Sequence, residues 1–166
     1  MAFNRSRSCL LAVALSIGTA AALCSSPAFA DIDVGLRGGV YTDVGEPFLG
    51  ADLLMQISDT RWFFNPNLEY VFVDPGDLAT LNLDVHYDLD TDNDDLYVWL
   101  GGGPAIVFRD DERHGRGDDE DEDDTDLGIN LLGGVGWQLE AFVPYVQAKA
   151  LIADDSEVVL AVGVRF

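Results

Sequence analysis

Residues 79–89 read ATLNLDVHYDL, with an apolar side chain at every odd position and a polar side chain at every even one. A repeat of two residues is typical of a β-strand with one apolar and one polar face, because successive side chains point to opposite sides of a sheet. The same alternation recurs along the chain, separated by turn-forming residues, and no window shows a sustained helical repeat. The eight alternating segments are 32–40, 49–57, 62–72, 79–89, 96–108, 127–138, 142–152 and 158–166.

Eight such strands can close in two ways. A soluble barrel or sandwich has its apolar faces inside, whereas a membrane barrel has an apolar belt facing lipid and a polar interior. The polar faces of this chain carry many glycines in mid-strand, where glycine weakens a sheet, and in a narrow interior they would make room for Trp99 and Tyr145. We therefore predict an all-β fold, an eight-stranded antiparallel up-and-down transmembrane β-barrel.

Aromatic residues on the apolar faces fall near the ends of the strands, with aliphatic residues between them. The two interfaces of a membrane favour such a pair of aromatic girdles. With the first strand starting in the periplasm, one girdle lies at the periplasmic end and the second at the outer end. The predicted girdle residues are Trp62, Phe64, Tyr87, Trp137 and Phe142 at the periplasmic end, and Tyr70, Phe72 and Phe108 at the outer end.

The lengths of the connections fit the same orientation. Three short connections, 58–61, 90–95 and 139–141, fall on the predicted periplasmic side, and the long one at about 109–126 falls outside. Short inner turns and longer outer loops are the rule for barrels of this class.

Three prolines, Pro66, Pro104 and Pro144, lie inside the predicted strands. A closed barrel has no edge strand on which a residue without an N–H could be tolerated. We therefore expect β-bulges at these positions.

The first thirty residues have the three parts of a secretory signal. A basic start is followed by an apolar run at 10–23 and by a small-residue cleavage motif at 27–30. We predict a cleaved signal peptide at 1–30 and a β-barrel domain at 31–166. Both cysteines lie in the predicted signal, so the exported chain would have no disulfide.

The chain is strongly acidic, with a net charge of −21. Nucleic acid is therefore excluded as a partner. Seven consecutive carboxylates in the long connection repel one another, so we expect a solvated extracellular loop. A sharper hypothesis is a weak, nonspecific contact with the divalent cations that bridge lipopolysaccharide phosphates. It would involve Asp118, Asp119, Glu120, Asp121, Glu122, Asp123 and Asp124; no specific metal site and no cofactor are expected.

Several charged residues lie on the polar faces and would point into the barrel, where a charge is costly unless it is paired. We expect ion pairs that link Arg37 and Lys149 to nearby carboxylates. Because side chains fill the interior of an eight-stranded barrel, this arrangement argues against a diffusion porin. The predicted interior network comprises Arg37, Asp52, Glu69, Asp84, His86 and Lys149.

Four motifs resemble the small outer-membrane β-barrel family, the group that includes opacity-type adhesins: 82–87 (NLDVHY), 101–103 (GGG), 133–137 (GGVGW) and 163–166 (GVRF). The alternating ending Val162, Val164 and Phe166 is similar to the signal that such proteins present to the barrel-assembly machinery. Val164 is smaller than the residue usual at the third position from the end. The resemblance implies a location more than an activity.

No catalytic arrangement is expected. A nucleophilic hydrolase needs a serine within reach of a histidine, but Ser58 and Ser156 fall in turns at opposite ends of the barrel, and neither pairs with His86 or His114. Our leading hypothesis is a nonenzymatic, monomeric outer-membrane barrel, in contact with lipid and lipopolysaccharide, with a structural or surface-contact role. The alternatives are a narrow channel or a conduit for small hydrophobic ligands, and a soluble periplasmic lipocalin-like binder.

Overall fold

The computed structural model describes residues 32–73, 76–110, 124–154 and 156–166. The predicted signal peptide at 1–30 therefore lies outside the described residues, as do 118–123 of the acidic run. The strands are β1 (Ile32–Tyr41), β2 (Glu46–Gln56), β3 (Trp62–Val71), β4 (Asp77–Asp88), β5 (Leu96–Asp110), β6 (Asp124–Trp137), β7 (Val143–Ile152) and β8 (Glu157–Arg165).

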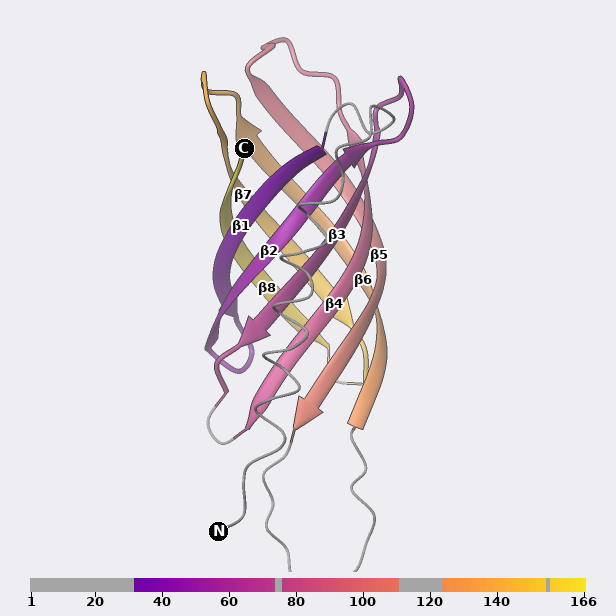
Figure 1. Ribbon diagram of the computed structural model, residues 1–166. Coiled ribbons are helices and arrows are strands. Elements are labelled where there is room, and N and C mark those ends of the chain that lie inside the picture. Colours follow the sequence, from indigo (N-terminus) through magenta and orange to yellow (C-terminus); the bar gives the residue numbers. More distant parts are fainter. Residues whose placement is uncertain (1–31, 74–75, 111–123, 155) are drawn as a thin grey trace, which may run out of the picture. The chain divides into compact units, whose positions relative to one another are not determined.

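Every strand pairs antiparallel with the next one in the sequence, and β8 pairs with β1 to close the barrel (Figure 1). The predicted fold class, an eight-stranded antiparallel up-and-down transmembrane β-barrel, is confirmed. Among the residues that the structure describes, no helix is long and apolar enough to cross a bilayer.

The two ends of the barrel differ in the connections that they carry. At the terminal end, β1 begins, β8 ends, and the β2–β3, β4–β5 and β6–β7 connections turn the chain (Figure 1). The opposite end, which we call the loop end, carries the other four connections. Pairing between β5 and β6 continues as far as Arg109 and Asp124, so both strands extend into the loop predicted at about 109–126.

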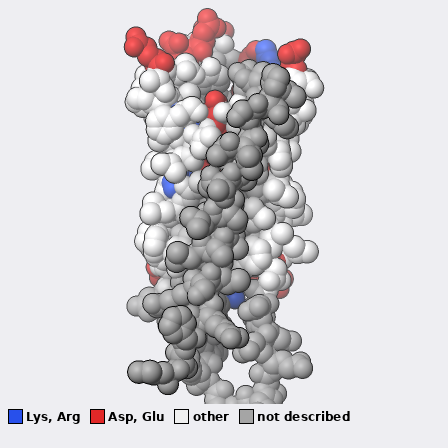
Figure 2. Space-filling model, viewed as in Figure 1, with Lys and Arg blue, Asp and Glu red and all other residues white. Residues whose placement is uncertain are grey.

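The outer surface of the barrel is apolar. Large apolar side chains are exposed on all eight strands, up to 77% for Leu127 on β6. A monomeric soluble protein rarely exposes so extensive an apolar surface, whereas the hydrocarbon of a bilayer requires one. Figure 2 shows acidic side chains gathered at the terminal end and mainly uncharged residues along the wall below them. The outer wall of the barrel is thus apolar and its rim is charged. A soluble barrel has the opposite arrangement, with its apolar faces inside.

The interior is polar over most of its length, but the loop end is filled by an apolar cluster. This part of the interior differs from the polar interior that the sequence predicted. The alternation stops there, because inward residues such as Val71, Val107 and Val159 lie between outward residues that are also apolar. The cluster consists of Tyr41, Phe48, Val71, Ala105, Val107, Leu151, Val159 and Ala161.

The β-bulges expected at the three prolines are absent, and that expectation was wrong. The register between neighbouring strands is constant on both sides of each proline. Instead, the pairing is interrupted next to each proline. The β2–β3 pairing has a gap at Pro66, and the β4–β5 pairing has a gap at Pro104. The β6–β7 pairing ends at Tyr145, one residue before it would reach Pro144. A missing N–H therefore costs one ladder hydrogen bond without shifting the strands.

At Pro66 a neighbouring side chain supplies the missing donor. The hydrogen bonds and register of the β2–β3 pair place the Leu53 carbonyl where it would accept a hydrogen bond from the backbone nitrogen of residue 66. Residue 66 is a proline, so its nitrogen has no hydrogen to donate. The Asn65 side-chain amide donates to that carbonyl at 2.6 Å. The acceptor is satisfied, and the pairing of β2 with β3 resumes on both sides of the gap.

Two interior glycines make room for the largest interior rings. A Cβ at Gly134 would lie 2.3 Å from Cζ2 of Trp99, and a Cβ at Gly163 would lie 2.4 Å from Cζ of Tyr145. Both rings are buried, and their centroids are 5.9 Å apart. Glycine at these positions is a steric requirement for packing Trp99 and Tyr145.

We expect Gly134→Ala to lower the free energy of unfolding by about 1–3 kcal/mol, because the added methyl group overpacks the ring of Trp99. The measurement is urea unfolding in lipid vesicles, with the folded fraction resolved by gel mobility. In a Trp99→Leu background the same change should cost less. An equal cost in both backgrounds would contradict the packing explanation.

Candidate functional site

The charged interior is the candidate site that the sequence singled out, and Glu69 on β3 is its centre. The Glu69 carboxylate accepts hydrogen bonds from Lys149 Nζ at 2.7 Å and from the Tyr41 hydroxyl at 2.7 Å. Its second oxygen lies 3.1 Å from Arg37 Nη2. Two cations from β1 and β7 thus share one carboxylate, in an interior that excludes water from all three side chains.

Asp52 on β2 forms a second centre, nearer the terminal end. It accepts hydrogen bonds from the Tyr145 hydroxyl at 2.8 Å and from Arg165 Nη2 at 3.0 Å. The Arg165 guanidinium also lies 4.4 Å from the centroid of the Tyr145 ring, a cation–π contact. The predicted network did not include Arg165, although its position on the polar face of the last strand was a usable signal.

Asp84 on β4 is held by neutral donors instead of cations. The side-chain amides of Asn67 and Asn130 each donate to it at 2.9 Å. Asn82 connects these two residues, since it donates to Asn67 at 2.9 Å and accepts from Asn130 at 2.8 Å. The sequence alone did not indicate that these asparagines are the partners of Asp84.

His86 is buried but does not share the ion pairs described for the network. Its ring stacks on Trp99, with the centroids 5.9 Å apart and the planes 12° from parallel. Trp99 in turn donates its indole N–H to Gln147 at 3.3 Å. His86 therefore contributes a packed ring to the interior.

All six residues of the predicted network lie inside the barrel, with at most 3% of any of them exposed. Among these six residues, direct ion pairs join Arg37 and Lys149 to Glu69, and Asp52 pairs with Arg165 outside the predicted set. With Arg165 included, the buried charged side chains of the described chain are three basic and three acidic ones. A buried charge must be paired and hydrogen-bonded to be tolerated, so this balance is a structural requirement.

The predicted girdle residues lie near the two ends of the outer wall. Ring centroids are 4.9 Å apart for Trp62 and Tyr87 at the terminal end, and 5.2 Å apart for Tyr70 and Phe72 at the loop end. The remaining members are Phe64, Trp137 and Phe142 at the terminal end and Phe108 at the loop end.

The residues of the predicted assembly signal face outward from the last strand. Phe166 is 65% exposed, and Val162 is exposed beside it on the same face, with Val164 between them partly covered. The backbone of Phe166 exchanges two hydrogen bonds with Val34, at 3.0 and 3.2 Å. The last residue is therefore tied into the seam that closes the barrel.

The candidate catalytic and metal-binding residues are dispersed. Ser58 lies in the β2–β3 connection, Ser156 lies just before β8 at the other end, and His86 is enclosed between them. In the described part of the chain, no group of three or more His, Cys, Asp or Glu side chains could hold a metal ion. Of the predicted cation contact, only Asp124 falls among the described residues, as the first residue of β6.

An exposed ion pair joins two connections at the terminal end. Arg61 after β2 contacts Asp90 after β4. The hydrogen bond from the Arg61 guanidinium lowers the pKa of the Asp90 carboxyl, and the same contact raises the pKa of Arg61. Both side chains are largely solvated, so the pair contributes little to stability.

Closure, antiparallel order and an apolar exterior define this chain as a small eight-stranded barrel of the outer-membrane type. Comparison with solved structures agrees. The N-terminal β-barrel domain of Pseudomonas aeruginosa OprF superposes with a TM-score of 0.66 at 15% identity, over 81% of this chain and 95% of that one. Neisserial surface protein A gives 0.54 at 14%, over 81% and 92%. The outer membrane enzyme PagL gives 0.52 at 13%, over 81% and 98%.

At these identities the likeness shows the fold alone, and it agrees with the eight-stranded outer-membrane barrel fold that the resemblance implied. No protein-family model and no curated protein matches the sequence. The three solved barrels share one architecture, and one of them is an enzyme.

We expect Glu69→Gln to lower the free energy of unfolding by about 3–5 kcal/mol, because it leaves two buried cations without their shared counter-charge. Urea unfolding in vesicles measures the change. Asp90→Asn, which breaks the exposed pair with Arg61, is the matched control and should leave the unfolding midpoint unchanged. Equal midpoints for wild type and Glu69→Gln would refute the stabilising role of the network.

Proposed function

We propose that this chain is a nonenzymatic, monomeric, integral outer-membrane protein with a structural or surface-contact role in the cell envelope. The observation that carries the proposal is the inverted polarity of the barrel. Exposed apolar side chains cover all eight strands, while charged and amide side chains fill most of the interior. The protein would contact lipid and lipopolysaccharide with its wall and display its acidic loop outside.

The filled interior argues against a conduit. The network around Glu69, Asp52 and Asp84 occupies the middle of the barrel, and the apolar cluster around Val71 and Val107 fills the loop end. A soluble lipocalin-like binder would need its apolar faces inside, where the described interior has mostly polar ones. The enzyme PagL shares the fold, but no serine–histidine pair comes together among the described residues of this chain.

Membrane fractionation and heat-modifiable gel mobility test the proposal. We expect the chain in the outer-membrane fraction, migrating differently before and after boiling, because a closed β-barrel resists detergent until it is heated. Recovery in the soluble periplasmic fraction without detergent would contradict the proposed location.

Assembly should depend on the last residue. We expect Phe166→Ala to reduce the amount of folded, heat-modifiable protein, because the proposed assembly signal ends on this exposed ring. Leu160→Ala removes an outward side chain from the same strand and is the matched control, expected to assemble normally. Equal losses for the two variants would indicate a general need for apolar surface on β8.

The acidic loop should respond to divalent cations. We expect calcium to slow proteolysis within 109–126, because seven adjacent carboxylates at 118–124 attract cations weakly. The rate of cleavage of the outer-membrane protein, with and without calcium, is the measurement. Identical rates would remove the cation-dependent contact and leave only a solvated loop.

A further inference from the structure

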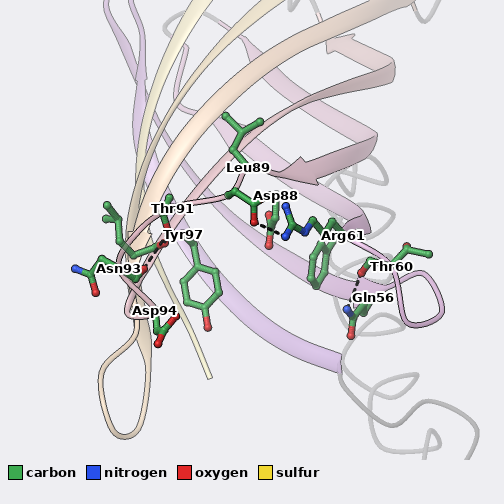
Figure 3. Close-up of a pocket in the computed structure, with 12 residues that line it drawn as sticks. Gln56, Thr60, Arg61, Asp88, Leu89, Thr91, Asn93, Asp94 and Tyr97 are labelled. Atoms are coloured by element: carbon green, nitrogen blue, oxygen red, sulfur yellow. Dashed lines mark hydrogen bonds and ion pairs between the residues drawn. The ribbon is translucent and has the colours of Figure 1, made fainter.

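Closure of the barrel pairs two strands that no connection joins. β1 and β8 are the first and last strands, and they pair over residues 35–41 and 159–165 (Figure 1). Between consecutive strands, the type and length of a short connection fix the register of the pairing. Figure 3 shows two such connections, in one of which the Gln56 side chain donates to the carbonyl of Thr60 at 2.7 Å. The register of the β8–β1 seam must be determined in another way.

The outward faces of the two strands cannot determine this register. Successive side chains of a strand change face, so a slip by two residues would keep every outward side chain outside. All outward positions on both sides of the seam are apolar or glycine, and the outer wall would therefore look the same after such a slip. These residues are Val158, Leu160, Val162 and Val164 on β8 and Val34, Leu36, Gly38 and Val40 on β1.

Inside the barrel, two ion pairs connect one side of the seam to the other. Lys149 on β7 contacts Glu69 on β3 at 2.7 Å, and Arg165 on β8 contacts Asp52 on β2 at 3.0 Å. The hydroxyl of Tyr145 on β7 also donates to Asp52, at 2.8 Å. All five side chains are buried. The two cations thus lie on the last two strands, and their carboxylates lie on strands beyond the seam.

A slip by two residues would move β7 and β8 by about 7 Å along β1, because each residue of an antiparallel strand advances about 3.4 Å. If the movement were toward the loop end, Arg165 would lie opposite Arg37. Lys149 would take the place of Leu151 in the apolar cluster. A cation beside a like charge and a cation among apolar side chains are both unfavourable.

A slip toward the terminal end is unfavourable as well. Leu151 would then face the buried carboxylate of Glu69, which would lose one of its two cations. Arg165 would lie opposite Asp33, and Asp52 would be left without a cation. The charged side chains therefore distinguish the observed register from both slipped ones, which the outward faces do not.

We propose that the Lys149–Glu69 and Arg165–Asp52 ion pairs set the register in which β8 closes on β1. A buried ion pair often adds no net stability over apolar residues of similar volume, but an alignment that separates its charges leaves each of them buried and unpaired. Selecting one register is the best attested role of such buried polar groups. The backbone hydrogen bonds of the seam then stabilise the alignment that the ion pairs select.

Disulfide formation between outward positions of the seam tests the proposal. Both cysteines of the chain, Cys9 and Cys24, are first replaced by serine. Val40→Cys with Leu160→Cys joins direct partners of the observed register, which we call the native pair.

Two further pairs report the slipped registers. Val40→Cys with Val162→Cys reports a slip toward the loop end, and Val40→Cys with Val158→Cys reports a slip toward the terminal end. In the observed register both are diagonal neighbours, about 7–8 Å apart, which is too far for a disulfide without movement of the backbone. The folded protein is oxidised and digested, and mass spectrometry measures the disulfide-linked peptides.

With the ion pairs intact, we expect a disulfide from the native pair and almost none from the slipped pairs. The test variant removes both partners of each pair together, so that no bare charge is left at either centre. In this variant we expect the ratio of slipped to native disulfide to rise about tenfold or more, because the charges no longer penalise a slip. Its substitutions are Asp52→Asn, Arg165→Met, Glu69→Gln, Lys149→Met and Arg37→Met.

A matched control separates loss of register from general loosening. Trp99→Leu removes a buried contact with Gln147 that does not cross the seam, and we expect it to give the native disulfide alone. A ratio that stays unchanged when the charges are removed, or that rises equally with Trp99→Leu, would overturn the proposal.

Heat-modifiable mobility shows that each variant has folded before it is oxidised. If the five-substitution variant does not fold, Asp52→Asn with Arg165→Met replaces it, because the Glu69 centre then stays intact. The ratio should rise less in this variant but still exceed that of Trp99→Leu, and no rise would overturn the proposal. The proposed membrane location is measured separately by fractionation, so failure of one proposal is distinguishable from failure of the other.

Discussion

Burial of six charges in a narrow closed barrel is the constraint on which the rest of this structure depends. A charge removed from water costs several kcal/mol unless opposite charges or hydrogen bonds compensate it. Here Glu69 neutralises both Arg37 and Lys149, Arg165 neutralises Asp52, and two asparagine amides hold Asp84. All of these contacts except the Asn67–Asp84 hydrogen bond join strands that are not consecutive in the sequence. The interior contacts consequently hold the barrel together.

The same constraint determines the two ends and the wall. The polar side chains point inward, and the side chains that alternate with them point outward and are apolar. A surrounding apolar phase is needed to cover such an outer surface. Toward the loop end the interior becomes apolar as well, with Tyr41 touching both regions: its hydroxyl bonds Glu69 and its ring packs against Phe48. Toward the terminal end the interior instead opens into an acidic mouth. The interior is therefore filled by apolar side chains at one end and bordered by acidic connections at the other.

Alternation in segments such as 79–89 was sufficient to predict the fold and the side of the wall on which each residue lies, because a period of two assigns alternate faces without knowledge of the partners. It could not predict which interior charges meet. Glu69 and Lys149 are eighty residues apart, and their contact depends on the closure and stagger of the barrel. The alternation also places Arg165 on the polar face of the last strand, but its pairing with Asp52 depends on the same closure. The expectation of β-bulges at Pro66, Pro104 and Pro144 was wrong. Near each proline the pairing with one neighbouring strand is interrupted, while the register of the strands is unchanged.

The arrangement at Asn65 and Pro66 has an evolutionary consequence. One carbonyl, that of Leu53, has a side-chain donor because the backbone donor opposite it does not exist. Replacing the proline alone would restore a second donor and set it in competition with the asparagine for one acceptor. Replacing the asparagine alone would leave that acceptor orphaned inside a membrane, where no solvent can substitute. The two positions should therefore covary among homologous barrels: asparagine and proline should occur together or be replaced together.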